Sequence, residues 1–155
     1  MCRSMSLIDD YSDYSLEGDR TTAAALKALF LPEDSTEWDE RYTFYQRRIT
    51  IDLAEEWYKE AKGFRENKQY KEAEDLLGSC IFLGEKLSEH FISAKYEYEM
   101  ALVFEALENY AAVAFWAKRA DDSFKKSSTL FGRGYALNFL GQAYDNLSKT
   151  KEAIE

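Results

Sequence analysis

The amino-acid sequence repeats a pattern of small and aromatic residues with a period of 40 residues. Each of three copies has a small residue, a second small residue seven positions later, and an aromatic residue three positions after that. Because spacings of three and seven return to one face of an α-helix, the pattern predicts helices, not strands. The aligned residues are Ala54, Ala94 and Gly134; Ala61, Ala101 and Gly141; and Phe64, Phe104 and Tyr144.

The repeat unit is expected to be a hairpin of two antiparallel helices, and the whole chain is predicted to be all-α. No segment alternates with period two over the length of a strand. Ala61 and Ala73 fall on opposite arms of the first hairpin and allow its helices to approach closely. One hairpin cannot bury both of its faces, so neighbouring hairpins must stack on it. Turns are expected near residues 66–68, 87–89, 107–109, 126–129 and 147–149.

The first copy resembles a tetratricopeptide repeat, with Trp57, Ala61, Phe64, Tyr70 and Ala73 at the motif's positions. The usual length of a tetratricopeptide repeat is about 34 residues. The longer period of this chain is similar to that of the longer-helix subclass of the family. The resemblance implies a right-handed superhelical solenoid of antiparallel helix hairpins. The second copy is the weakest, because Glu97 stands where a bulky first-helix residue belongs and Val113 replaces the small alanine.

Three segments are predicted along the chain: a flexible acidic tail (1–18), N-terminal capping helices (19–51) and the repeat array (52–155). The capping helices are expected at 21–31, ending at Pro32, and at 36–49, capped by Ser35 or Thr36. A break is expected near Ile49, although a continuous helix to Phe64 is an alternative. The capping helices could instead dock or dimerise. The repeats are placed at 54–93, 94–133 and, in part, 134–155.

The partial third repeat leaves two interpretations open. The chain is either a piece of a longer array with further repeats of its own, or its last helix is supplied by a partner, because a solenoid needs a capping helix.

Charge and composition exclude several classes of function. With 20 basic and 29 acidic residues the net charge is −9, which disfavours binding to nucleic acid or to an anionic membrane. No apolar core follows Arg3 as in a signal peptide, and no apolar run is long enough for a membrane helix, so we expect no membrane insertion. Two cysteines and one histidine provide no disulfide framework and no zinc motif. We interpret Cys2 and Cys80 as reduced thiols, which indicate a cytoplasmic protein. We expect no metal and no cofactor.

Catalytic patterns are missing from the sequence, and we expect no enzymatic activity. His90 has no local nucleophile and acid with which to form a triad. The Gly132-Arg133-Gly134 segment lacks the spacing and the following Lys of a phosphate-binding loop. His90 is more simply a residue of a helix cap.

The resemblance to tetratricopeptide repeats implies that the first helix of each repeat lines a concave groove. Tyrosines there suit recognition of a peptide, because the ring is rigid and its hydroxyl is polar. They would otherwise pack between adjacent helices. Lys62, Arg65 and Lys95 form a small basic zone that favours an acidic partner segment. The predicted groove residues are Glu55, Tyr58, Lys62 and Arg65; Lys95, Tyr98, Leu102 and Glu105; and Tyr135, Asn138, Gln142 and Asp145.

The resemblance therefore implies a protein–protein interaction adaptor or scaffold that binds a peptide or helix in this groove. One alternative is a regulator of the bacterial peptide-sensing type, in which a short peptide in the groove changes the superhelix. Another is a structural module whose groove is filled by its own N-terminal segment.

Overall fold

The computed structural model describes residues 19–154, and the predicted tail at 1–18 lies outside the described residues. The chain divides into two compact units between Arg48 and Ile49. The described residues form seven α-helices and one 3-10 helix, and they include no strand, so the all-α prediction is confirmed. None of these helices is long and apolar enough to cross a membrane.

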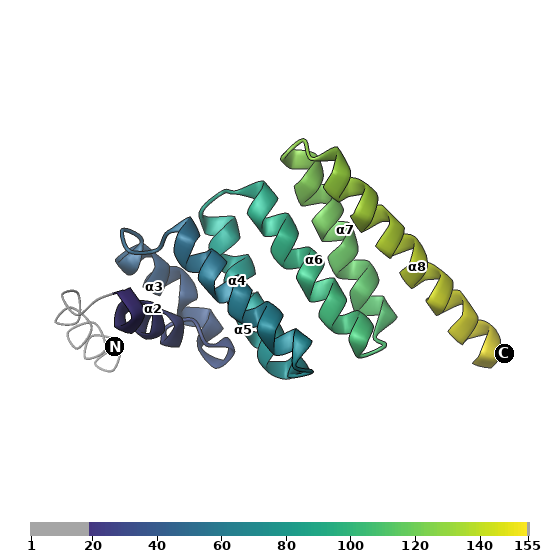
Figure 1. Cartoon of the computed structure of the whole chain (residues 1–155), viewed down its shortest axis with the longest axis horizontal. Helices are drawn as coiled ribbons and strands as arrows, with labels where there is room; N and C mark the ends of the chain where they lie inside the picture. Colours follow the sequence, from purple (N-terminus) through teal and green to yellow (C-terminus); the bar gives the residue numbers. More distant parts are fainter. Residues whose placement is uncertain (1–18, 155) are drawn as a thin grey trace. The chain divides into compact units, whose positions relative to one another are not determined.

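The second unit consists of five consecutive helices, each of which packs against the next (Figure 1). Three-residue turns join them, so neighbouring helices run antiparallel. The first helix also touches the third, which brings the first helices of two successive repeats together. The helices are α4 (Ile51–Glu66), α5 (Tyr70–Lys86), α6 (His90–Ala106), α7 (Tyr110–Lys126) and α8 (Leu130–Ile154).

The four turns of this unit share one geometry and recur every 20 residues. Each places a non-glycine residue in the left-handed region: Lys68, Ser88, Glu108 and Ser128 have φ between 56° and 62°. At Lys68 the backbone N–H donates to Arg65 O (2.9 Å), and the next N–H donates to Phe64 O (2.8 Å). This is the Schellman arrangement, which satisfies carbonyls at the helix end. The first four predicted turns are therefore confirmed.

In the first two copies, the predicted small residues lie where consecutive helices touch. Ala54, Ala61, Ala94 and Ala101 on α4 and α6 have no exposed surface. Trp57 is 2% exposed. A residue of this size at a buried position typically contributes about 3–5 kcal/mol relative to alanine. In these two copies the 40-residue pattern therefore marks the core of the second unit, whereas Gly134 and Gly141 of the third copy are exposed.

The predicted turn at 147–149 is wrong, because α8 continues through it to Ile154. Extending a helix adds one hydrogen bond per residue, whereas a hairpin gains stability only when a second helix packs back. Among the described residues, no second helix packs back after residue 149. Propagation is therefore favoured over the turn.

The first unit departs from the prediction at both helix ends. The helix α2 spans Asp19–Ala28, three residues short of Leu31, and a 3-10 helix follows at Pro32–Glu37. The helix α3 spans only Trp38–Tyr45, and neither Ser35 nor Thr36 caps it. The predicted extents of 21–31 and 36–49 are therefore wrong at these ends.

The Arg41 side chain accounts for these shorter helices. Its guanidinium donates to Leu29 O (2.7 Å) and to Asp34 Oδ2 (3.2 Å), and it also pairs with Glu37. These bonds join the end of α2 to the 3-10 helix, and charged groups strengthen them. The local propensities that predicted a cap at Ser35 are overridden by this long-range contact.

The break near Ile49 is confirmed, and the continuous helix to Phe64 is excluded. Thr50 has an extended backbone, and its hydroxyl oxygen accepts a hydrogen bond from Leu53 N at 3.2 Å. Thr50 is therefore the N-cap of α4, a role for which threonine is well suited.

We expect Glu108→Gly to raise the free energy of unfolding by about 0.5–1 kcal/mol, because glycine adopts a positive φ without the Cβ clash that glutamate has there. Denaturation in urea measures the change. The matched control is Lys118→Gly in the middle of α7, which should lower stability by about 1 kcal/mol. A neutral or destabilising effect of Glu108→Gly would contradict the assigned turn geometry.

Candidate functional site

Predicted groove residues on α4 and α6 form a ladder of ion pairs. Lys95 Nζ lies 2.9 Å from Glu55 Oε2, and Arg65 Nε pairs with Glu99. The hydroxyl of Tyr96 donates to Glu55 Oε1 at 3.0 Å. The paired residues are 34 to 41 positions apart in the sequence, so the packing of α4 against α6 brings them together.

Tyr58 stands at the centre of this ladder. Its ring lies 5.0 Å from the Tyr96 ring, between centroids, and the ammonium groups of Lys62 and Lys95 approach it at 5.4 and 5.2 Å. Burial, with the nearby carboxylates of Glu99 and Glu55, raises the pKa of Tyr58 to about 12. The phenol therefore stays neutral at physiological pH and acts as a polar, hydrogen-bonding surface.

Two of the three residues in the predicted basic zone already have carboxylate partners within the chain. Lys95 and Arg65 are both paired, and Lys62 is the one whose described contact is a ring face. An acidic partner segment would have to compete with Glu55 and Glu99 for these cations. Of the predicted basic zone, only Lys62 is therefore expected to attract an acidic partner segment without competing with a carboxylate that the structure pairs with it.

Two of the predicted residues of the second repeat are half-buried in a hydrophobic cluster. Tyr98 and Leu102 pack against a core that contains Ala101, Phe139 and Ala143. The Tyr98 and Phe139 rings lie 5.6 Å apart. Tyr98 thus connects α6 to α8. This position is as consistent with packing between helices as with lining a groove, the two roles considered for this tyrosine.

The predicted residues of α8 are exposed. Tyr135 is 59% exposed, and its ring lies 6.0 Å from that of Phe131, which is 81% exposed. Asn138 and Gln142 are also exposed. These four residues share one side of α8, because they are spaced by three or four positions. We call them the aromatic stripe.

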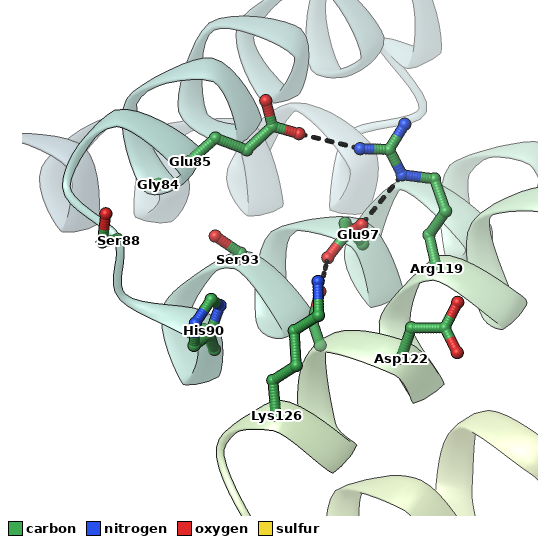
Figure 2. Close-up of a pocket in the computed structure, with 10 residues that line it drawn as sticks. Gly84, Glu85, Ser88, His90, Ser93, Glu97, Arg119, Asp122 and Lys126 are labelled. Atoms are coloured by element: carbon green, nitrogen blue, oxygen red, sulfur yellow. Dashed lines mark hydrogen bonds and ion pairs between the residues drawn. The ribbon is translucent and has the colours of Figure 1, made fainter.

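A second site was missed by the sequence prediction. A pocket of about 330 Å³ opens between the end of α5, the start of α6 and the second half of α7. Figure 2 shows His90 and Lys126 at its edge and Glu97 within it. Glu97 occupies the repeat position of Trp57, so a carboxylate replaces a large apolar side chain and the space beside it is polar.

Glu97 is 3% exposed, but its carboxylate is fully engaged. Arg119 Nε donates to Glu97 Oε2 at 3.0 Å, and Ser123 Oγ donates to Oε1. Arg119 also binds Glu85 at 2.8 Å (Figure 2). Burial raises the pKa of Glu97 more than the bonds from Ser123 and Arg119 lower it. The signal available in the sequence was the misfit of Glu97 with the repeat.

The remaining sequence candidates have structural roles. Cys80 is buried, and its burial raises the pKa of the thiol well above the usual range. His90 is the exposed first residue of α6. Across residues 19–154, no three His, Cys, Asp or Glu side chains are grouped to hold a metal ion.

Comparison with protein-family models, curated proteins and solved structures found no match. The resemblance to tetratricopeptide repeats therefore stays a prediction. The protein is defined here by its own features: packed antiparallel helices, an exposed aromatic stripe on α8, and a buried carboxylate at Glu97.

We expect the stability of the protein relative to a Glu97→Gln variant to fall as pH rises. The unfolded glutamate has a pKa of about 4.3, and the folded pKa is raised. In the window between these values the native state holds the proton more tightly, so deprotonation favours unfolding. Urea denaturation from about pH 4 to pH 8 measures the difference between the two proteins.

Glu85→Gln is the matched control, since Glu85 binds the same arginine but its side chain is 55% exposed. This variant removes a bond to Arg119 without removing a buried carboxylate, so it separates the loss of that bond from the effect of burial. A difference between wild type and Glu97→Gln that is constant, or that grows in favour of wild type with pH, would contradict the burial effect.

Proposed function

We propose that the protein is an interaction module that binds a helical or extended segment of a partner protein along α6 and α8. In this proposal residues 49–154 form a solenoid of the tetratricopeptide type, and the aromatic stripe is the main contact surface. The module acts in the cytoplasm and has no catalytic role. The observation that carries the proposal is the concentration of exposed large side chains on α8.

Exposed apolar side chains are distributed unevenly over the structure. Among the described side chains, five of the eleven exposed large hydrophobic ones belong to α8. Two of them, Phe131 and Tyr135, belong to the aromatic stripe, and neighbouring exposed apolar residues mark interaction sites more often than scattered single residues do. Phe131 and Tyr135 are adjacent on this stripe, and aromatic side chains are frequent anchors of protein interfaces.

The two polar residues of the aromatic stripe are suited to recognise a main chain. Asn138 and Gln142 each carry an amide that both donates and accepts hydrogen bonds. Because the two cations Arg65 and Lys95 are paired internally, strong attraction of an acidic segment is not expected there. The net charge of −9 also repels acidic partners. An apolar or aromatic segment with accessible backbone amides fits these groups better.

The proposal predicts that a photo-crosslinking residue at Asn138 captures a partner protein from the native host. We expect Phe131→Ala with Tyr135→Ala to reduce this capture by about tenfold or more, as loss of interface anchors does. Both side chains are more than half exposed, so the melting temperature should stay the same. The measurements are quantitative mass spectrometry of the crosslinked products and thermal denaturation.

A crosslinking residue at Lys118 is the matched control, because Lys118 is an exposed residue of α7 outside the aromatic stripe. It should not capture the same partner. Equal capture from both positions, or capture unchanged in a folded double variant, would contradict the proposed function. Tyr98→Ala is a poorer probe, since Tyr98 contributes to packing between α6 and α8.

A further inference from the structure

The helix α8 has a second exposed side, distinct from the aromatic stripe. Leu137 is 46% exposed and Tyr144 is 53% exposed, and Gly141 lies between them. Successive residues of an α-helix turn by about 100°, which places this group roughly a third of a turn away from Asn138 and Gln142. We call Leu137, Gly141 and Tyr144 the hairpin stripe.

The repeat shows what normally covers this stripe. In the first copy the equivalent residues are Trp57, Ala61 and Phe64 on α4, and α5 packs against α4. Trp57 is 2% exposed and Ala61 has no exposed surface. The stripe on α4 is thus the inner side of a helix hairpin.

The second copy repeats this arrangement. Glu97 and Ala101 on α6 are 3% and 0% exposed, and α7 packs against α6. Two copies of the stripe are therefore covered by a helix that follows them. Among the described residues, α8 has no such following helix.

The glycines of α8 confirm that this side of the helix is open. A methyl group added at Gly134 or Gly141 would meet no atom within 4 Å. The equivalent residues Ala54, Ala61, Ala94 and Ala101 are fully buried under the following helices. A surface shaped for close helix contact is present on α8 and is unoccupied within residues 19–154.

We propose that the hairpin stripe binds an amphipathic helix of a partner protein that carries the residue pattern of α5. The covering helix α5 presents the compact residues Ala73, Leu77 and Cys80, spaced by four and three positions, all without exposed surface. Small residues in the partner helix would leave room for Leu137 and Tyr144; α5 packs in this way against α4, on which Trp57 is buried.

A second copy of α8 is a poorer occupant than a helix of the α5 type. Packing two hairpin stripes together would place Leu137 and Tyr144 of one copy against large side chains of the other. Overpacked contacts of this kind are destabilising. This inference rests on the repeat register and does not depend on the aromatic stripe or on the proposed function.

A synthetic peptide of residues 69–87, with Cys80→Ala and a fluorescent label, is a direct probe because its sequence covers the equivalent stripe on α4. We expect the full-length protein to bind it saturably, as measured by fluorescence anisotropy. Gly141→Arg should weaken binding by about tenfold or more, a factor equivalent to about 1.4 kcal/mol, because the arginine side chain occupies the closest point of approach.

Two control variants separate the possible explanations. Gly141→Ala should keep the binding, since alanine is present at the equivalent buried positions, and Tyr135→Ala should keep it because Tyr135 lies on the aromatic stripe. Both Arg and Ala favour helix more than Gly does, so neither change should unfold α8. Circular dichroism checks this expectation.

Four outcomes would overturn the inference. The first is an absence of saturable binding. The second is binding that Gly141→Arg leaves unchanged, which would place the peptide elsewhere, for example in exchange with α5 itself. The third is a dimer of the chain, detected by sedimentation, that Gly141→Arg converts to a monomer, because a second copy would then be the occupant. Loss of binding in Tyr135→Ala alone would implicate the aromatic stripe and the proposed function instead.

Discussion

The close approach of helices at alanine residues is the contact on which residues 49–154 depend. Ala61 and Ala101 on the first helices, and Ala73 and Ala117 on the second, have no exposed surface. A larger side chain at any of them would force the helices apart, at a cost of about 1–3 kcal/mol. The distances between helices are thus set by the smallest residues of the repeat, while Trp57 and other large side chains fill the space beside them.

This contact works only if the alanines of neighbouring helices stay in register. The left-handed residues recur every 20 residues, so α5, α6 and α7, each with its turn, have the same length. One extra residue would rotate all later positions by about 100° and carry an alanine such as Ala101 away from its neighbour. The uniform turn keeps these alanines in register. This benefit explains why the strained backbone at Glu108 and Ser128 is tolerated.

The parts of the fold that the sequence predicted are those encoded by local or periodic signals. Thr50 caps its own helix, and the turn around Lys68 lies at the end of an apolar pattern. The end of α2 was missed because Arg41 reaches back to Leu29 O, a contact twelve residues away that no local propensity contains. The turn at 147–149 was predicted from the repeat alone, although a turn also needs a helix that packs after it.

In the candidate site, too, features set by the repeat could be predicted, and features set by long-range contacts could not. Exposed residues of α8 such as Tyr135 were found from their register. The ion pairs of Lys95 with Glu55 and of Arg65 with Glu99 could not be predicted, because several acids lie within reach of each cation until the packing of α4 against α6 selects one. The basic zone inferred from the sequence was thus a set of residues that the fold largely neutralises.

One repeat position shows how the three copies have come to differ in role. Trp57 is a large buried apolar side chain, whereas Glu97 is a buried carboxylate paired with Arg119. Leu137 is 46% exposed. A buried carboxylate costs several kcal/mol in desolvation unless it is bonded, so Glu97 binds α6 to α7 through specific bonds in place of general hydrophobic contact. Leu137 retains the apolar chemistry of Trp57 and has no covering helix within the described residues, so the position that forms the core in the first copy is an open surface in the third.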